Sequence, residues 1–346
     1  MMHFSAGYQY PDDPEGERFP EIVEDYLPQV SEVYFAPGNE RSARTPAAEA
    51  SGFTEEEASV ILREDLAVLK KSGVALNLLF NANCHGAGSV AKSTADRVLR
   101  TVDSFGSATG IDSVTTASFF IAHVIREHFP GLRIRASVNM KLGTVEALEY
   151  ASEVFDSFCI QRDINYHFAA LERIAGWARR NGKHLCLLAN SGCLRNCAAQ
   201  IFHDNLVAHI GEMKTGDCLM TYDPVFCRRF YSGERHRWEY LMHSTVIRPE
   251  DVPQYESIVP LMKLATRTHW NPRLVLDAYT RGRFTGNIFD LTEPGHGVFF
   301  RGFVLENGLI PPEYWQKKSS CDENCRACGF CEQVMKCALV PCPELQ

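Results

Sequence analysis

The sequence lacks several features that would assign it to a common class of protein. Its 346 residues contain no apolar run near the ~20 residues of a membrane-spanning helix, and a formal charge of −8 argues against a general grip on nucleic acid. The first residues lack the basic start and apolar stretch of a signal peptide, so we expect a cytoplasmic protein. There is no G-x-S-x-G elbow, Walker loop, H-E-x-x-H motif or dinucleotide fingerprint. These absences exclude the common motif-defined classes of enzyme, and the chain instead has one type of residue in excess.

That excess is cysteine. The chain has 13 cysteines, a high count for a reducing compartment, and an odd number leaves at least one thiol outside any complete disulfide scheme. Six lie from Cys321 to Cys342 and four from Cys193 to Cys227. Clustered thiols in a chain without a secretory signal are more often metal ligands than disulfides. The sequence therefore predicts metal binding.

Short apolar runs typical of buried strands alternate with helix-like stretches. Residues 54–71 begin with a capping box and keep apolar residues three and four apart, and residues 166–180 form an amphipathic pattern that stops at Asn181-Gly182. This alternation predicts parallel βαβ units, and eight units favour an α/β fold of the (β/α)8 type over an open doubly wound sheet. The expected strands are residues 3–8, 32–36, 75–80, 112–117, 133–139, 155–161, 184–190 and 258–265.

We expect three parts in the chain. Residues 1–285 form the barrel, interrupted after the seventh strand by an irregular insertion at 190–257, a length that is usually functional in a compact domain. Residues 286–319 are a loop-rich connector, and residues 320–346 are a cysteine-rich, metal-binding tail.

Reactive residues follow four of the predicted strands. In a (β/α)8 barrel the carboxyl ends of the strands meet at one mouth, so these groups are expected to face one another. They are residues 81–85 (NANCH), Arg162 with Asp163, residues 191–197 (SGCLRNC), and Lys263 with Arg267. Because cations are rarely buried without a partner, Lys263 and Arg267 indicate either an anionic substrate in the mouth or a structural salt bridge to a barrel carboxylate.

Cys193, Cys197 and Cys227 are the leading ligands of a metal centre, with Cys84 or Cys218 as the fourth. Thiolates suit an iron–sulfur cluster or zinc, although zinc more often uses C-x2-C pairs than the C-x3-C spacing found here. His203 and His209 keep a mixed Cys/His site open. By contrast, Cys159 and Cys186 lie within apolar strands and are expected in the core.

The tail carries a second candidate metal site. Its thiols have the spacing C-x3-C-x2-C-x2-C, and their number within so few residues indicates a [4Fe–4S] cluster or, as the alternative, zinc. The first three repeat the spacing of radical S-adenosylmethionine enzymes, but that motif normally follows the first barrel strand and here it stands at the far end. The tail ligands are Cys321, Cys325, Cys328 and Cys331.

From about residue 20 to 282, the sequence resembles the collagenase-like peptidase family, peptidase family U32. Glu32-Val33-Tyr34-Phe35 is similar to the family's A-V-Y-F-G strand, and Gln161-Arg162-Asp163 resembles its R-E-L turn. Ser191-Gly192-Cys193 resembles S-G-R-C without the arginine, and residues 263–267 (KLATR) resemble K-I-E-G-R without the glutamate. The tail is not part of the usual family pattern. The missing glutamate puts an acid–base role at that position in doubt.

The resemblance implies a barrel and, in several branches, a cysteine-ligated [4Fe–4S] cluster. Those branches include proteins of oxygen-independent ubiquinone hydroxylation and of RNA hydroxylation. We therefore expect an iron–sulfur enzyme of anaerobic redox or hydroxyl-transfer chemistry on a small anionic or aromatic substrate. A redox protein partner or an oligomer fits that expectation; a membrane or general nucleic-acid partner does not. The alternatives are a hydrolase of the peptidase kind, with zinc or structural cysteines, and a non-catalytic iron–sulfur subunit.

Overall fold

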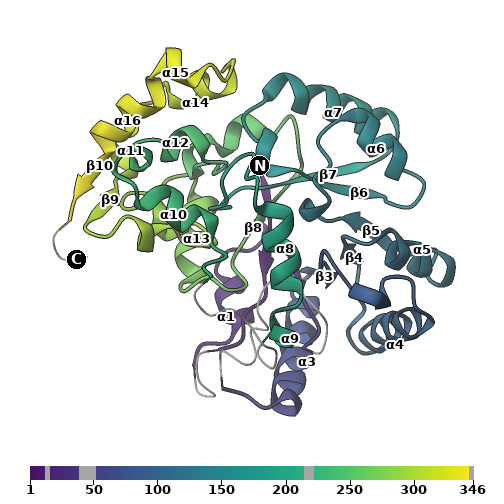
Figure 1. Cartoon of the computed structure of the whole chain (residues 1–346). Helices are drawn as coiled ribbons and strands as arrows, with labels where there is room; N and C mark the ends of the chain where they lie inside the picture. The colour runs from purple at the N-terminus through teal and green to yellow at the C-terminus, as the bar shows by residue number, and fades with distance from the viewer. Residues whose placement is uncertain (12–15, 39–51, 214–221, 343–346) are drawn as a thin grey trace.

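A closed barrel of eight parallel strands forms the centre of the molecule (Figure 1). The computed structural model describes residues 1–11, 16–38, 52–213 and 222–342. Each strand pairs with the next in sequence, and β1 pairs with β8 to close the ring. The strands are β1 (His3–Gly7), β2 (Val30–Phe35), β3 (Ala75–Phe80), β4 (Ser113–Thr116), β5 (Arg133–Ala136), β6 (Ser157–Ile160), β7 (His184–Leu188) and β8 (Leu261–Leu264). The predicted (β/α)8 barrel is confirmed.

All eight predicted strands are present, but several are shorter than the sequence pattern indicates. β5 ends at Ala136, and Val138 already belongs to the 3-10 helix η2 (Val138–Met140). β8 begins at Leu261 because Pro260, which has no N–H to donate, precedes it. Apolar composition alone does not show where the hydrogen-bonded ladder stops.

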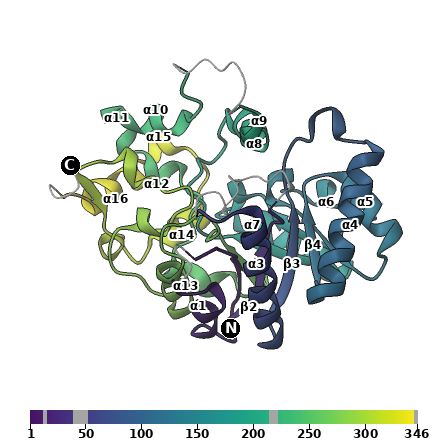
Figure 2. The same ribbon diagram turned by 90° about the horizontal axis from the view of Figure 1, so that it is seen from below.

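A ring of helices covers the outside of the barrel, one after nearly every strand (Figure 2). The predicted capping box is confirmed at the start of α3, where the Thr54 hydroxyl accepts the Glu57 N–H and the Glu57 carboxylate accepts the Thr54 N–H. The ring consists of α1 (Phe19–Glu24), α3 (Glu55–Lys71), α4 (Lys92–Thr109), α5 (Phe119–His128), α6 (Val145–Ala151), α7 (Phe168–Arg180) and α13 (Pro272–Arg281).

The two faces of the barrel strands carry different chemistry. Because strand side chains alternate between faces, residues such as Leu76, Leu78 and Phe80 point outward into the apolar core under the helices. The alternate positions point into the lumen of the barrel and are largely polar. They include Ser5, Glu32, Asn77, Ser113, Thr115, Arg135, Ser157, Cys159, Cys186 and Lys263. The lumen of the barrel is thus lined mostly by buried polar side chains.

Residues 226–243 of the insertion after β7 and the C-terminal residues lie together on one side of the barrel (Figures 1 and 2). β9 (Phe303–Leu305) pairs with β10 (Leu339–Pro341) in a two-stranded antiparallel sheet. The other elements are α8 (Gln200–Ala208), α9 (Ile210–Met213), α10 (Phe226–Ser232), α11 (Glu234–Arg237), α12 (Tyr240–His243), α14 (Tyr314–Ser319), α15 (Cys325–Cys328) and α16 (Phe330–Ala338). The stretch expected as a connector thus contributes β9 and α14, and β10 joins the tail to it.

No helix in the described part of the chain has both the length and the apolar character needed to cross a lipid bilayer.

Candidate functional site

The loop that carries Cys193 leaves β7 at the mouth of the barrel and is held there from two sides. The Asn190 side chain donates to the carbonyls of Ala265 and Leu291 and accepts the Ala265 N–H, which ties the ends of β7 and β8 together. Gly192 donates to the Glu293 carbonyl at 3.2 Å. A side chain at Gly192 would collide with the Pro294 carbonyl, so only glycine allows this close approach. The position of Cys193 is therefore fixed by the fold.

Three of the predicted ligands come together at this mouth. Cys193 and Cys197 lie in the loop after β7, and Cys227 lies in the first turn of α10. The pKa of the Cys227 thiol is raised to about 11, chiefly by burial and then by the nearby Cys193 and Cys197. Burial likewise raises the pKa of Cys197, with Cys193 adding to it. Three half-buried thiols that repel one another's ionisation are a set that a bound cation would stabilise as thiolates.

Polar groups without a partner in the described structure surround this thiol set. Tyr231 and Tyr240 interact electrostatically with Cys227, and their rings lie 5.4 Å apart. The Tyr231 hydroxyl and both ring nitrogens of His296 are buried without a hydrogen-bond partner in the described residues. The His296 ring lies 5.7 Å from that of Tyr231, and burial lowers its pKa to about 4. Orphaned polar groups of this kind are what a bound polar group or cluster would satisfy.

The predicted pair Arg162 and Asp163 follows β6, in the 3-10 helix η3 (Arg162–Ile164), and its two members behave differently. Arg162 is buried and interacts electrostatically with Cys193. Asp163 is half-buried and accepts the backbone N–H of Asn196 at 3.0 Å. Arg162 is thus part of the thiol site, whereas the Asp163 carboxylate supports the loop between Cys193 and Cys197.

Lys263 lies inside the lumen, on β8. Its ammonium group sits 3.7 Å from the centre of the Tyr34 ring, a cation–π contact. Burial lowers the pKa of Lys263 to about 8, and nearby Arg267 and Arg135 act in the same direction. A cation that is partly discharged near neutral pH can bind an anion and can also exchange a proton.

Arg267 is nearly buried just beyond β8 and interacts electrostatically with Lys263. The two predicted cations therefore lie close together, as their strand-end positions required.

The one carboxylate found among the lumen residues, Glu32, is committed to a salt bridge. Arg135 donates two hydrogen bonds to it at 2.6 and 2.8 Å, and the Ser5 hydroxyl donates a third at 2.6 Å. Burial would raise the pKa of Glu32, but the Arg135 guanidinium and these hydrogen bonds hold it below its usual range. Glu32 is therefore held mainly by Arg135, while the Lys263 ammonium lies against the Tyr34 ring.

The other predicted ligands of the barrel site lie in the loop after β3 and on α8. Cys84 lies in the loop after β3, where its sulfur accepts the Gly86 N–H at 3.3 Å. That loop contacts α8, because the Asn83 amide reaches the Asp204 carboxylate at 3.4 Å. His203 lies within α8 and His209 at its C-terminal end. Cys218 lies outside the described residues.

The tail thiols gather around a buried lysine. The pKa of Cys331 is raised by burial, opposed by Lys318, and raised further by Cys321, Cys325 and Cys328. The Lys318 ammonium donates to the Leu241 carbonyl at 2.8 Å, and burial lowers its pKa. The predicted tail ligands are therefore neighbours of one another.

The tail also contacts the barrel mouth. Glu323, between Cys321 and Cys325, forms ion pairs with Arg195 and His167. A small cavity of about 20 Å³ is lined by residues of both sites, among them Arg162, Arg195, Cys321, Cys325 and Cys331. Arg195 lies between the two thiols of the mouth loop, so the two cysteine sets are linked through one ion pair.

The donor chemistry of both sets fits a thiolate-bound metal. Within the described ranges, no three cysteine, histidine or acidic side chains already stand in metal-coordinating positions. The fit therefore rests on the sulfur donors and on the orphaned Tyr231 and His296 groups beside them. Cys193, Cys197 and Cys227 would hold a group at the mouth, and the four tail thiols would hold a second.

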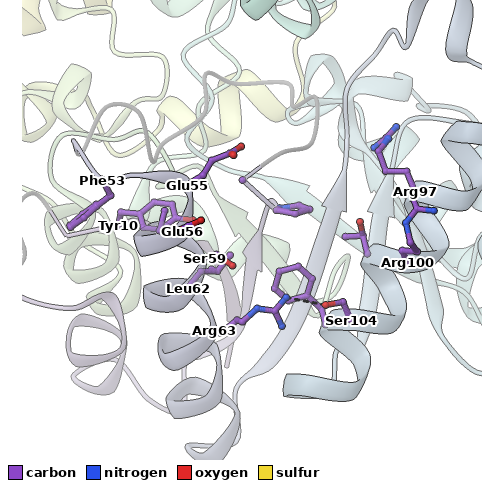
Figure 3. Close-up of a pocket in the computed structure, with 15 residues that line it drawn as sticks. Tyr10, Phe53, Glu55, Glu56, Ser59, Leu62, Arg63, Arg97, Arg100 and Ser104 are labelled. Carbon is purple, nitrogen blue, oxygen red and sulfur yellow. Dashed lines mark hydrogen bonds between the residues drawn. The ribbon is translucent and has the colours of Figure 1, made fainter.

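A groove on the outer surface was not predicted from the sequence. It lies between α3 and α4, encloses about 720 Å³, and is lined by Arg63, Arg97, Arg100, Phe53 and Phe105 among others (Figure 3). Arg63 donates to the Ser104 hydroxyl and stacks over Phe105. Arg63 lies on α3, and Arg97 and Arg100 lie on α4. The sequence did not predict the groove because the spacing of residues within one helix does not show which helix packs beside it.

Comparisons with known proteins agree with this architecture. The chain is 27% identical over 293 residues to an uncharacterized protease of Methanocaldococcus jannaschii, covering 80% of this chain and 82% of the relative. The solved U32 peptidase Mk0906 superposes with a TM-score of 0.53 at 14% identity, covering 77% of this chain and 93% of that one. A glycoside hydrolase family 5 mannosidase from Rhizomucor miehei gives a TM-score of 0.42 at 12% identity over 75% of this chain and 80% of its own. No protein-family model matches the chain.

The fold and the site define a (β/α)8 barrel protein with a thiol-lined mouth and a cysteine-rich C-terminal extension. The sequence motifs resemble those of the U32 peptidase family, the archaeal relative is similar over most of the chain, and the solved U32 peptidase shares the barrel fold.

Proposed function

We propose that this chain is an iron–sulfur enzyme of anaerobic redox or hydroxyl-transfer chemistry, acting in the cytoplasm on a small anionic or aromatic substrate. The observation that carries the proposal is the gathering of Cys193, Cys197 and Cys227 at the mouth of the barrel, beside the buried Arg162. Cysteine thiolates are the ligands that hold iron–sulfur clusters.

In this proposal a [4Fe–4S] cluster at the mouth supplies one-electron transfer. The chain's own residues do the rest. Lys263 and Arg267 bind the anionic part of the substrate, and the lowered pKa of Lys263 allows its ammonium to give up a proton during the reaction. Glu32 and Arg135 neutralise each other and keep the lumen polar without opposing the substrate's charge. The Tyr34 ring contacts the Lys263 ammonium and helps to position it.

The tail is proposed to hold a second cluster, with zinc as the alternative. Glu323 pairs with Arg195 of the mouth loop and with His167 at the start of α7, which holds the tail beside the mouth, where a second cluster would supply electron transfer from a redox protein partner. In the alternative where the tail binds zinc, the same contacts would serve docking only.

A peptidase function is the second candidate, because the archaeal relative is named a protease and the solved neighbour a U32 peptidase. It would use zinc or leave the thiols as structural groups. A third possibility is a non-catalytic subunit whose clusters serve a partner or an oligomer.

Metal analysis of anaerobically purified protein tests the proposal. The expected result is a brown protein that absorbs near ~400 nm and contains roughly four to eight irons and matching sulfide per chain. A colourless protein with stoichiometric zinc would overturn the redox proposal and favour the hydrolase. Lys263→Ala should retain the iron, which separates loss of substrate binding from loss of the cluster.

A further inference from the structure

Two cysteines that the proposed function does not use form a pair inside the barrel. Cys159 on β6 and Cys186 on β7 are register partners in neighbouring parallel strands. Their sequence neighbours Phe158, Ile160 and Leu187 point outward into the core, so both thiols point into the lumen. The two thiols interact with each other electrostatically. They are as buried as the sequence predicted, at 2% and 0% exposure, but they lie on the polar side of the sheet.

Cations face this pair from three other elements. Lys263 on β8, Arg135 on β5 and Arg162 after β6 all favour the charged form of Cys159. The interaction with Cys186 and then these cations lower the pKa of Cys159 to about 7, while the same pairing raises the pKa of Cys186. A thiol that only fills space in a core lies among apolar groups, where burial keeps it neutral. Cys159 instead lies near three cations.

The geometry also limits what the pair can do. Register partners on adjacent strands lie about 4.8 Å apart, which falls inside the ~4.4–6.8 Å range of Cα separations that a disulfide spans. Two sulfurs alone are too few for zinc, and the described residues show no third metal donor beside them. Lys263, which interacts with both thiols, keeps partial solvent exposure.

We propose that Cys159 and Cys186 are a two-electron dithiol centre, which closes to a disulfide with a small peroxide and reopens with a dithiol reductant. The Cys159 thiolate attacks one oxygen of hydrogen peroxide and becomes a sulfenic acid, and Lys263 protonates the departing hydroxide to water. The Cys186 sulfur then attacks the sulfenic sulfur, forming the S–S bond and releasing a second water. In total, two thiols and one peroxide give one disulfide and two waters.

Peptide mass spectrometry of the full-length protein tests this inference. The reduced chain is treated with hydrogen peroxide, alkylated, unfolded and cut with trypsin, which yields residues 142–162 with Cys159 and residues 184–195 with Cys186 and Cys193. We expect a linked pair of these peptides with the bond assigned to Cys159 and Cys186, absent before peroxide and lost again with dithiothreitol. A link through Cys193 instead, or oxidation of Cys159 to a sulfinic acid without a link, would overturn the proposal.

Variants test whether disulfide formation depends on the lumen cations and on Cys186 rather than on exposure of the thiols alone. Lys263→Met should slow disulfide formation about tenfold, because removing a nearby cation raises the thiol pKa by about one unit. Lys263→Arg should restore most of the rate, and Cys186→Ser should stop oxidation at the sulfenic acid, which a dimedone probe captures. Equal rates in wild type and Lys263→Met, with matching circular dichroism, would contradict the role of the lumen cations.

The dithiol pair does not depend on the proposed iron–sulfur clusters. Cys159→Ser should leave the iron content unchanged, so a colourless protein that still forms the Cys159–Cys186 link refutes the cluster but not the dithiol. A brown protein that forms no link refutes the dithiol but not the cluster.

Discussion

At the scale of single residues, Lys263 combines burial with positive charge, and this has a cost in stability. Its charged form is less favourable in the folded protein than in the unfolded chain, because burial lowers its pKa from 10.5 to about 8. Lys263→Met should therefore raise the free energy of unfolding at pH 7, by about 1–2 kcal/mol after allowing for partial solvent screening.

The pH dependence gives the sign of this effect. Below pH 8, Lys263 is charged in both states and the penalty is complete; it fades as the pH rises from about 8 to 10.5 and the unfolded chain also loses its proton. Urea titrations of wild type and Lys263→Met should converge over that range. The exposed Lys71→Met is the control and should show no such convergence. A Lys263→Met protein that is less stable at pH 7 would show that the Tyr34 contact outweighs burial.

The same lysine makes anion binding pH-dependent. Because the proposed substrate anion pairs with its charged form, affinity should be constant below about pH 7 and fall roughly tenfold per pH unit above pH 8. Calorimetric titration with a small carboxylate or phosphate that binds at the mouth would measure this. Affinity that is flat to pH 10 would remove Lys263 from the anion site.

The Tyr231 hydroxyl offers a residue-scale test of the thiol site. If it donates to a cluster held by Cys193, Cys197 and Cys227, then Tyr231→Phe should retain iron but lower the cluster's reduction potential, since hydrogen bonds to cluster sulfur raise it. A redox titration followed by electron paramagnetic resonance measures the shift. The control is Tyr222→Phe, an exposed ring on the described part of the insertion, which should leave the potential unchanged. An unchanged potential in Tyr231→Phe would show that this hydroxyl does not face a cluster.

At the scale of secondary-structure elements, the tail is fastened to the barrel by the ion pairs of Glu323 with Arg195 and His167. Partly exposed pairs contribute on the order of 1 kcal/mol, so Glu323→Gln should increase local opening of the tail by a few fold without unfolding the barrel. Hydrogen exchange of α14 to α16 would detect it. Lys336→Ala, which breaks an exposed pair within α16, is the matched control and should not free the tail from the mouth.

The sequence predicts the elements of the barrel well, because apolar strands and capped amphipathic helices are local patterns. The capping box at Thr54 and the strand Ala75–Phe80 are examples. The helices of the insertion are harder to predict. α10 has no capping side chain at its start, and Arg229 is the basic residue of its last turn, so its sequence gives few signals of where it begins and ends. Its position depends on aromatic contacts with distant residues such as His296 and Phe300.

The polar lumen shows the same limit within a single strand. In Arg133–Ala136 the polar and apolar residues alternate, and this indicates two unlike faces. The alternation does not say that the polar face is enclosed by seven other strands. The pairing of Arg135 with Glu32 joins residues 103 positions apart, and only the closed ring brings them together. For the same reason, Cys159 and Cys186 read as apolar core from the sequence alone.

At the scale of the whole molecule, the chain has two thiol sets, one at the barrel mouth and one in the tail, linked through Arg195 and Glu323. Whether the sets load metal independently is the central question, because the proposed reaction uses the first and the proposed electron entry uses the second. The barrel itself has no need of either set to close its hydrogen-bonded ring.

The most direct test compares the iron content of three anaerobically purified proteins: wild type, Cys193→Ala/Cys197→Ala, and Cys325→Ala/Cys328→Ala. The account predicts that each double variant folds, by circular dichroism, and loses about half of the iron, with a different electron paramagnetic resonance signal remaining in each. Full iron in the Cys193→Ala/Cys197→Ala protein would contradict the account, because the barrel mouth would then hold no cluster.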